Sequence, residues 1–233
     1  MWLFIAKQSE YMRKTTILGC LLCCACTFVM AQDAKKYSTY YYQRATLFEQ
    51  LPITSKDIVF VGNSITDGGE WCELFDSKHV KNRGISGDVA MGVYDRLDPI
   101  VKGKPKKVFL LIGINDVSAG RSPEEIMKGI EMIASKIKKE SPKTKLYIQS
   151  ILPVNKDLNM FHGHTSKGDV VIATNELIRT FCQKNGLTFV DLYAQMKNDG
   201  DEKMNPLYTN DGLHLLGPGY IKWKEIVMPY VKE

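Results

Sequence analysis

Short, almost purely apolar runs recur along the chain and limit its fold more than any other feature of the sequence. The clearest are residues 57–62, Asp-Ile-Val-Phe-Val-Gly, and residues 107–113, Lys-Val-Phe-Leu-Leu-Ile-Gly. A strand with one face in water alternates apolar and polar side chains, whereas continuous apolar runs need cover on both faces. Such runs are typical of a parallel sheet with helices packed on both sides.

Weaker runs and amphipathic stretches continue this alternation toward the C-terminus. Further strands are expected at residues 80–85, 145–151 and 187–192, and helices at residues 88–101, 172–185 and 219–231. Another helix begins at Ser122, where an N-cap residue, a proline and two acidic residues precede apolar side chains at helical spacing. The pattern predicts an α/β fold with five parallel strands and no internal domain boundary.

Residues 1–31 are predicted to be a signal peptide for export. The basic pair Arg13-Lys14 precedes an uncharged apolar run, residues 15–30, and Val29-Met30-Ala31 offers a cleavage site. The run is shorter than the roughly 20 apolar residues that span a bilayer. We therefore expect a secreted or periplasmic protein with no stable membrane span, and Met12 is an alternative start.

Two other interpretations of the N-terminus stay open, a buried helix and a lipid anchor on Cys20 or Cys26. Residues 32–56 are polar and rich in tyrosine, and we expect them to form a helical extension on the outside of the main domain, residues 57–233. The oligomeric state is also open, with a homodimer among the alternatives.

Composition excludes some classes of function. The formal net charge is +5, and because residues 1–31 hold three Lys or Arg and one Glu, +3 remains on the rest of the chain. The lysines are scattered without interleaved aromatic residues, so a nucleic-acid partner is not expected. Beyond the leader only Cys72 and Cys182 remain, which could pair or simply be buried, and no metal motif uses them.

A residue that could act as a nucleophile or as a hydrogen-bond donor follows each of three predicted strands. Ser64 comes after the first strand in Gly-Asn-Ser-Ile-Thr, and Gly87 lies in a turn after the second. Asn115 follows the third and most apolar strand. Because ligand sites in open α/β sheets form at the carboxyl ends of strands, a nucleophile and two hydrogen-bond donors are expected close together there.

The last loop supplies an acid and a base at close spacing. Asp211 precedes His214 by three residues in Asn-Asp-Gly-Leu-His. A carboxylate can hold one ring nitrogen, which leaves the other free as a base. A serine hydroxyl needs such a base to act as a nucleophile. Together these residues predict serine-based ester hydrolysis.

Four blocks of the sequence resemble those of the SGNH hydrolases, also called GDSL-like lipases or acylhydrolases, from about Asp57 to the C-terminus. They are Gly62-Asn-Ser64-Ile-Thr66, Gly87, Gly113-Ile-Asn-Asp116 and Asp211-Gly-Leu-His214. The details are most similar to platelet-activating factor acetylhydrolase catalytic subunits and to bacterial esterases that deacetylate sugars. The resemblance implies a flavodoxin-like three-layer α/β/α sandwich and no cofactor.

The resemblance also implies roles for individual residues. Ser64 would be the nucleophile and His214 the general base with Asp211 as its partner. The amides of Ser64 and Gly87 and the side chain of Asn115 would form the oxyanion hole. One departure is Asn63, where the family block usually has Asp. This puts a proton-handling role of that position in doubt and leaves the nucleophile unaffected.

The substrate is expected to be a small acyl ester, with acetyl as the favoured acyl group and a carbohydrate as the favoured alcohol. We assign substrate contacts to Asn63, Asp116, Phe161 and His162. The last two lie in a long polar loop, residues 153–167, and long loops in compact domains are often functional. The aromatic residues Trp71, Tyr94, Phe161 and Tyr208 near the site-bearing segments also suggest a sugar.

Three competing functions remain. The first is a phospholipid or platelet-activating-factor-like acetylhydrolase, and the second a non-catalytic carbohydrate-binding surface protein on a hydrolase-like scaffold. The third is a metal-dependent hydrolase that uses His162, His164 and Asp169, although these residues lack a recognisable ligand spacing.

Overall fold

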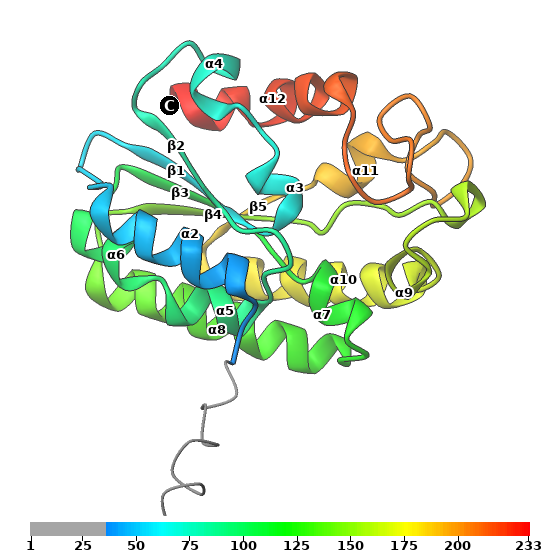
Figure 1. Cartoon of the computed structure of the whole chain (residues 1–233), viewed down its shortest axis with the longest axis horizontal. Coiled ribbons are helices and arrows are strands. Elements are labelled where there is room, and N and C mark those ends of the chain that lie inside the picture. Colours follow the sequence, from blue (N-terminus) through cyan, green and yellow to red (C-terminus); the bar gives the residue numbers. More distant parts are fainter. Residues whose placement is uncertain (1–35) are drawn as a thin grey trace, which may run out of the picture. The chain divides into compact units, whose positions relative to one another are not determined.

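Five parallel strands form one sheet in the order β2-β1-β3-β4-β5 in the part of the chain that the computed structural model describes, residues 36–233 (Figure 1). The strands are β1 (Ile58–Gly62), β2 (Val80–Gly84), β3 (Lys107–Leu111), β4 (Lys145–Gln149) and β5 (Thr188–Val190). Each lies within one of the five predicted apolar runs, so the predicted α/β fold is confirmed. The predicted signal peptide lies outside the described residues.

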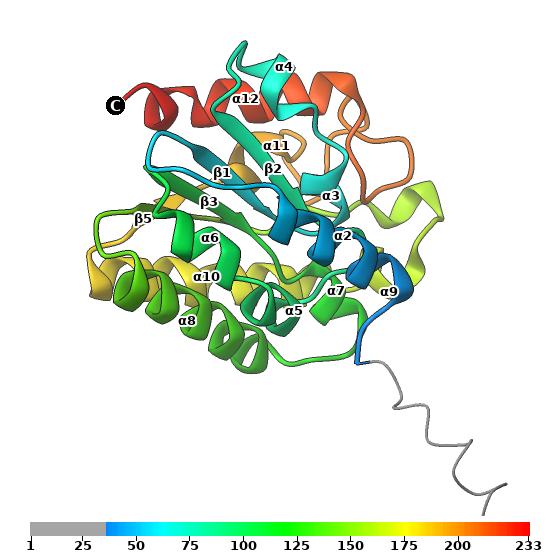
Figure 2. The same ribbon diagram turned by 60° about the vertical axis from the view of Figure 1, so that its left-hand side comes forward.

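Helices cover both faces of the sheet, which gives three layers (Figures 1 and 2). One face carries α4 (Trp71–Leu74), α11 (Leu192–Met196) and α12 (Gly217–Lys232), and the other carries α5 (Ala90–Asp95), α6 (Asp98–Gly103), α8 (Pro123–Glu140) and α10 (Gly168–Asn185). Short helices follow strands at the carboxyl end of the sheet, namely α3 (Ser64–Asp67) and α7 (Ile114–Ser118), while η1 (Lys156–Leu158) and α9 (His162–Thr165) lie in the predicted long loop. Helix α2 (Thr39–Gln50) precedes β1, within the segment expected to be helical.

An aromatic stack fills the core beneath α4 and α12. Phe60 and Phe109 are paired in register on β1 and β3, and their rings stack at 4.8 Å between centroids. Trp71 stacks on Phe60 at 4.0 Å, and Trp223 meets Trp71 edge-on at 4.7 Å. Both tryptophan side chains are essentially fully buried. Because such rings bury large apolar areas in defined geometry, this cluster fixes α4 and α12 against the sheet.

One predicted element is wrong. Residues 88–101 were expected to form a single helix, and the structure has two, α5 and α6, separated at Arg96 and Leu97. Pro99 explains the break, because proline lacks the N–H that would bond to the carbonyl of Asp95 and its ring would clash there. Proline is tolerated in the first turn of α6, where no such bond is needed.

Cys72 and Cys182, the two cysteines among residues 36–233, do not pair. Cys72 is exposed, whereas Cys182 is buried in the core, and both are free thiols. Burial raises the pKa of Cys182 to about 11, so this thiol is inert at neutral pH. From residue 36 onward, no helix has the length and apolar character needed to cross a membrane.

Gly84 allows α3 to pack directly on the end of β2. A Cβ at this position would lie 2.2 Å from the backbone nitrogen of Asp67 and 2.6 Å from its Cα. We predict that Gly84→Ala lowers the free energy of unfolding by about 1–3 kcal/mol, the usual cost of overpacking. Urea unfolding followed by circular dichroism measures this change.

Gly168→Ala is the matched control. Gly168 is the first residue of α10, and a Cβ there would meet its nearest neighbour, Cγ2 of Val154, at 3.7 Å, an ordinary van der Waals distance. Its free energy of unfolding should stay within about 0.5 kcal/mol of the unchanged protein. Equal losses in the two variants would contradict the close packing of α3 on β2.

Candidate active site

The predicted site residues converge where the connections leave the sheet in opposite directions. The chain passes from β1 to β2 on one side and then crosses to β3 on the other side of β1. Ser64 begins α3 directly after β1, Gly87 follows β2, and Asn115 lies in α7 after β3. In open α/β sheets, ligands usually bind at the carboxyl edge of the strands beside such a point.

Asn63 shapes the turn that presents Ser64. It is the N-cap of α3, and its Oδ1 accepts a hydrogen bond of 3.1 Å from the backbone N–H of Ile65. The Asn63 side chain is completely buried, whereas Ser64 is half-buried. Its burial argues against the predicted substrate contact of Asn63, because the residue holds the backbone beneath the serine instead.

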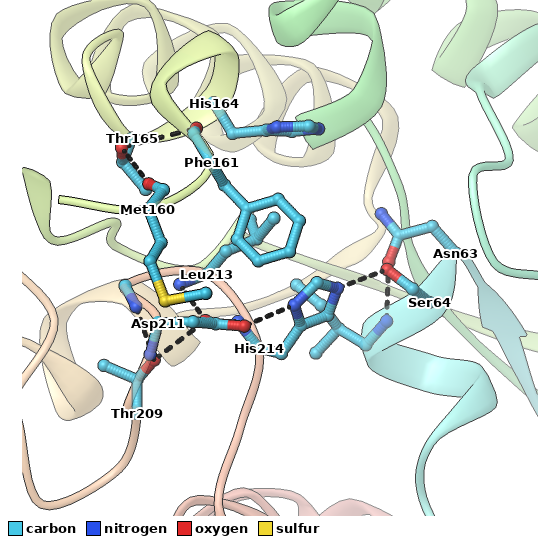
Figure 3. Close-up of polar contacts among 12 residues, drawn as sticks. Asn63, Ser64, Met160, Phe161, His164, Thr165, Thr209, Asp211, Leu213 and His214 are labelled. Atoms are coloured by element: carbon cyan, nitrogen blue, oxygen red, sulfur yellow. Dashed lines mark hydrogen bonds and ion pairs between the residues drawn. The ribbon is translucent and has the colours of Figure 1, made fainter. Parts of the chain in front are cut away.

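The structure brings Ser64, His214 and Asp211 into one hydrogen-bonded chain (Figure 3). The Ser64 Oγ lies 3.1 Å from Nε2 of His214. Nδ1 of the same ring lies 2.8 Å from Oδ2 of Asp211. Since an ionised carboxylate only accepts hydrogen bonds, the ring proton belongs on Nδ1, and the lone pair of Nε2 faces the serine hydroxyl.

Backbone hydrogen bonds shape the loop that carries Asp211 and His214. Oδ1 of Asp211 accepts hydrogen bonds from the backbone N–H groups of Leu213 and His214, at 2.8 and 2.7 Å. Gly212 between them has a φ of +83°, and a Cβ there would lie 2.1 Å from the carbonyl oxygen of Asn155. The turn therefore requires glycine, both for its backbone angle and for the close approach of Asn155.

Burial alone would raise the pKa of the Asp211 carboxyl. The hydrogen bonds from the backbone N–H and the ring of His214 and from the N–H of Leu213 outweigh burial, so the pKa lies below its ordinary value. Asp211 is therefore ionised at neutral pH, which suits a residue that orients a histidine and stabilises its imidazolium form.

Three groups at the strand ends can donate to an oxyanion. Gly87 adopts a φ of +79° in an open turn, and Asn115 Nδ2 donates one of its two hydrogens to the carbonyl oxygen of Asp88 at 2.8 Å. Within residues 36–233 no acceptor occupies the backbone N–H of Ser64 or Gly87. These two amides and the second hydrogen of Asn115 are thus free for a ligand.

A buried ion pair that no local sequence pattern predicts supports this edge of the site. Arg96 Nε donates to Oδ2 of Asp88 at 2.7 Å, while its other nitrogens donate to the carbonyl oxygens of Arg83 and Gly62 at 2.9 and 3.0 Å. Burial raises the pKa of Asp88 to about 6, and Arg96 opposes this by favouring the carboxylate.

Asp116 does not lie where the sequence suggested. Its side chain is fully buried, and its two oxygens accept hydrogen bonds from the N–H of Ala90 at 2.9 Å and from Arg121 at 2.5 Å. Burial raises the pKa of this carboxyl. These contacts argue against a substrate-binding role, and instead they tie the start of α5 to α7.

The long loop, residues 153–167, places aromatic and imidazole groups beside the hydrogen-bonded residues Ser64, His214 and Asp211. Phe161 is 43% exposed, and its ring meets that of His214 edge-on at 5.1 Å between centroids (Figure 3). His162 is exposed at the start of α9. His164, which we had not assigned to the site, lies 3.0 Å from Asn115 through its Nε2.

The structure does not support the metal-dependent alternative, and it leaves one of the four aromatic residues as a candidate for sugar binding. In the described part of the chain, no three His, Cys, Asp or Glu side chains are grouped as metal ligands, and His164 contacts Asn115 instead. Trp71 belongs to the core, and Tyr94 and Tyr208 pack against it. Of the four aromatic residues that suggested a sugar, Phe161 has the exposed ring.

Comparison with known proteins identifies relatives of this chain. Residues 60–221 match the GDSL-like Lipase/Acylhydrolase family. The human platelet-activating factor acetylhydrolase IB subunit alpha2 is 29% identical over 191 residues, which cover 76% of this chain and 78% of the human protein. The crystal structure of a GDSL-like lipase from Bacteroides thetaiotaomicron aligns with a TM-score of 0.71 and 26% identity, covering 82% of this chain and 97% of that one.

The low pKa of Asp211 predicts a pH-dependent contribution to stability. The folded protein binds this proton less tightly than the unfolded chain, so the contribution is complete above the ordinary pKa of Asp and is lost as the pH falls through the lower pKa of the folded state. Asp211→Asn should therefore lower the free energy of unfolding by about 1–3 kcal/mol at neutral pH, and by a decreasing amount as the pH falls below the ordinary pKa of Asp. Urea titrations across this range measure the difference, and a loss independent of pH would show that the carboxylate charge is not involved.

Proposed function

The chain belongs to the GDSL-like lipase and acylhydrolase family and is an ester hydrolase, and from this premise we propose that it is an exported serine esterase that removes small acyl groups, acetyl above all, from carbohydrates. The observation that carries the mechanism is the continuous hydrogen bonding from Asp211 through His214 to Ser64, at 2.8 and 3.1 Å. The site lies at the carboxyl edge of the sheet, beside the point where the connections diverge, which is the usual place for a ligand in such folds.

The proposed reaction has two halves. His214 Nε2 takes the hydroxyl proton of Ser64 as Oγ attacks the ester carbonyl carbon, and Asp211 stabilises the imidazolium that forms. The amides of Ser64 and Gly87 and the side chain of Asn115 stabilise the oxyanion. His214 then protonates the leaving alcohol, which leaves an acyl group on Ser64. A water molecule, deprotonated by His214, releases the acid and restores the serine.

The position of Phe161 supports an extended alcohol group. His214 must protonate the leaving oxygen, so the alcohol lies on the histidine side of the site, where the exposed ring of Phe161 stands. An aromatic face packs well against the apolar C–H groups of a sugar ring. The predicted export segment favours a substrate outside the cytoplasm, where polymeric carbohydrates occur.

A phospholipid-type acetyl ester is the second candidate. The human relative is named for acetylhydrolase activity on platelet-activating factor. Met160 beside Phe161 is also exposed, at 48%, so the rim near His214 has apolar surface that a lipid could contact. Both candidates share the acetyl group and the proposed catalytic residues, and they differ in the alcohol.

Replacing the nucleophile tests the mechanism. Ser64→Ala should reduce hydrolysis of 4-nitrophenyl acetate by at least about 10⁴-fold, because the remaining groups cannot form an acyl intermediate. Its melting temperature should stay close to that of the unchanged protein, since Ser64 is half-buried and its hydroxyl contacts the His214 side chain. Turnover by this variant at the normal rate would overturn the assignment of Ser64. No turnover by the unchanged protein on any ester would favour the non-catalytic binding protein.

A substrate panel tests the acyl group and the alcohol. We expect kcat/KM for 4-nitrophenyl esters to fall steadily from acetate through butyrate to octanoate. Acetylated xylan should release acetate faster than an acetyl phospholipid in micelles, and Phe161→Ala should lower this rate while changing 4-nitrophenyl acetate hydrolysis less. A preference for octanoate, or for the phospholipid, would contradict the proposed substrate and leave the role of Ser64 intact.

A further inference from the structure

Helix α9 is fastened to α7, the helix that carries Asn115. Gly163 of α9 lies so near α7 that a Cβ on it would be 2.9 Å from Oγ of Ser118. Lys167 Nζ donates to the carbonyl oxygens of Val117 and Ser118, at 2.9 and 3.3 Å, and so satisfies the end of α7. The close packing of Gly163 on Ser118 and the hydrogen bonds of Lys167 hold the α9 backbone at a fixed distance from Asn115.

The Asn115 amide has a different partner on each side. Nδ2 donates to the carbonyl oxygen of Asp88, and Oδ1 lies 3.0 Å from Nε2 of His164. Because an amide oxygen only accepts, Nε2 must be the protonated nitrogen of His164. A flipped amide would set its oxygen against the carbonyl oxygen of Asp88, so Asp88 selects the orientation of the amide. The neutral ring of His164 matches this orientation with Nε2 as the donor and holds the amide from its other side.

We propose that His164 is a positioning residue for the oxyanion hole, which holds the Asn115 amide so that its free N–H faces the developing negative charge. This inference rests on the proposed function, in which Asn115 donates to the oxyanion. A donor that is already oriented needs no reorganisation when the charge forms, and this preorganisation is the source of most of its effect on rate. His164 touches no reacting atom itself.

The surroundings of His164 suit this role. Burial, together with the nearby His214 and Lys167, lowers its pKa. His164 is therefore neutral at neutral pH and does not repel the imidazolium that His214 becomes during the reaction. The ring of Phe161 packs edge-on against both histidines, at 6.2 Å from His164 and 5.1 Å from His214 (Figure 3). The edge contact limits the rotation of the His164 ring.

The first test compares kcat and KM of four variants on 4-nitrophenyl acetate. His164→Ala should lower kcat by about 10–100-fold, less than the 10²–10³-fold expected for Asn115→Ala, and change KM by less than about threefold. His164→Gln should restore most of kcat, because its Nε2 can donate from nearly the same place. His79→Ala is the matched control, since His79 has a comparable hydrogen bond to Asp57, at 3.0 Å, at the opposite end of the sheet. It should leave kcat unchanged.

A double-mutant cycle separates positioning from a general effect on the fold. In the Asn115→Ala background, His164→Ala should lower kcat by less than about twofold, because the amide that it orients is gone. Independent losses that multiply would overturn the proposal, as would an unchanged kcat in His164→Ala, and thermal unfolding confirms that each variant is folded. Ser64→Ala in the same assay distinguishes failure of the proposed function from failure of the positioning role of His164. If it abolishes turnover while His164→Ala does not lower kcat, only the positioning role fails.

Discussion

The buried guanidinium of Arg96 holds together three chain segments on which the site depends. It donates to the carboxylate of Asp88 and to the carbonyl oxygens that end β1 and lie near the end of β2, at Gly62 and Arg83. Removing one partner of such a buried pair leaves an uncompensated charge, at a typical cost of about 3–5 kcal/mol. The pair therefore fixes the loop after β2 relative to the turn that carries Ser64. The backbone of Asp88 in turn accepts the hydrogen bond from Asn115.

The second support of the site comes from the C-terminal half of the chain. The turn at Gly212 packs so closely against the backbone of Asn155 that there is no room for a side chain at Gly212. The N–H of Asn155 also donates a hydrogen bond of 2.9 Å to the Gly212 carbonyl oxygen. The loop before α10 thus contacts the acid–base loop, and through His164 it also contacts Asn115. One irregular segment therefore contacts both the loop of His214, the proposed base, and Asn115, the proposed oxyanion donor, which gives this long loop a structural purpose.

Much of the fold and the central part of the site could be predicted from local sequence patterns. Apolar runs gave the five strands, and residues directly after a strand lie at a common edge whatever the details of packing, so Ser64 and Asn115 could be placed near each other. Asp211 and His214 are only three residues apart, so their contact is also local. The break at Pro99 is a local signal too, and the expected single helix overlooked it.

The rest of the site depends on contacts that no local pattern records. Asp116 follows Asn115 directly, but α7 turns successive side chains by about 100°, so Asp116 points into the core while Asn115 faces the site. His164 lies 49 residues from its partner Asn115, and Arg96 lies 34 residues from Gly62. Trp71 is an aromatic residue of the kind that can bind sugars, and only its stacking on Phe60 shows that it belongs to the core.

The central claim is that Ser64 carries the acyl group during turnover, and its most direct test is to observe that intermediate. The protein is mixed with 4-nitrophenyl acetate, quenched in acid within the first turnover, digested and analysed by mass spectrometry. We predict one acetyl group on the peptide that contains Ser64, formed in a burst and absent from His214→Ala, in which no base activates the serine. Acetyl on another residue, or turnover without any acylated peptide, would contradict it.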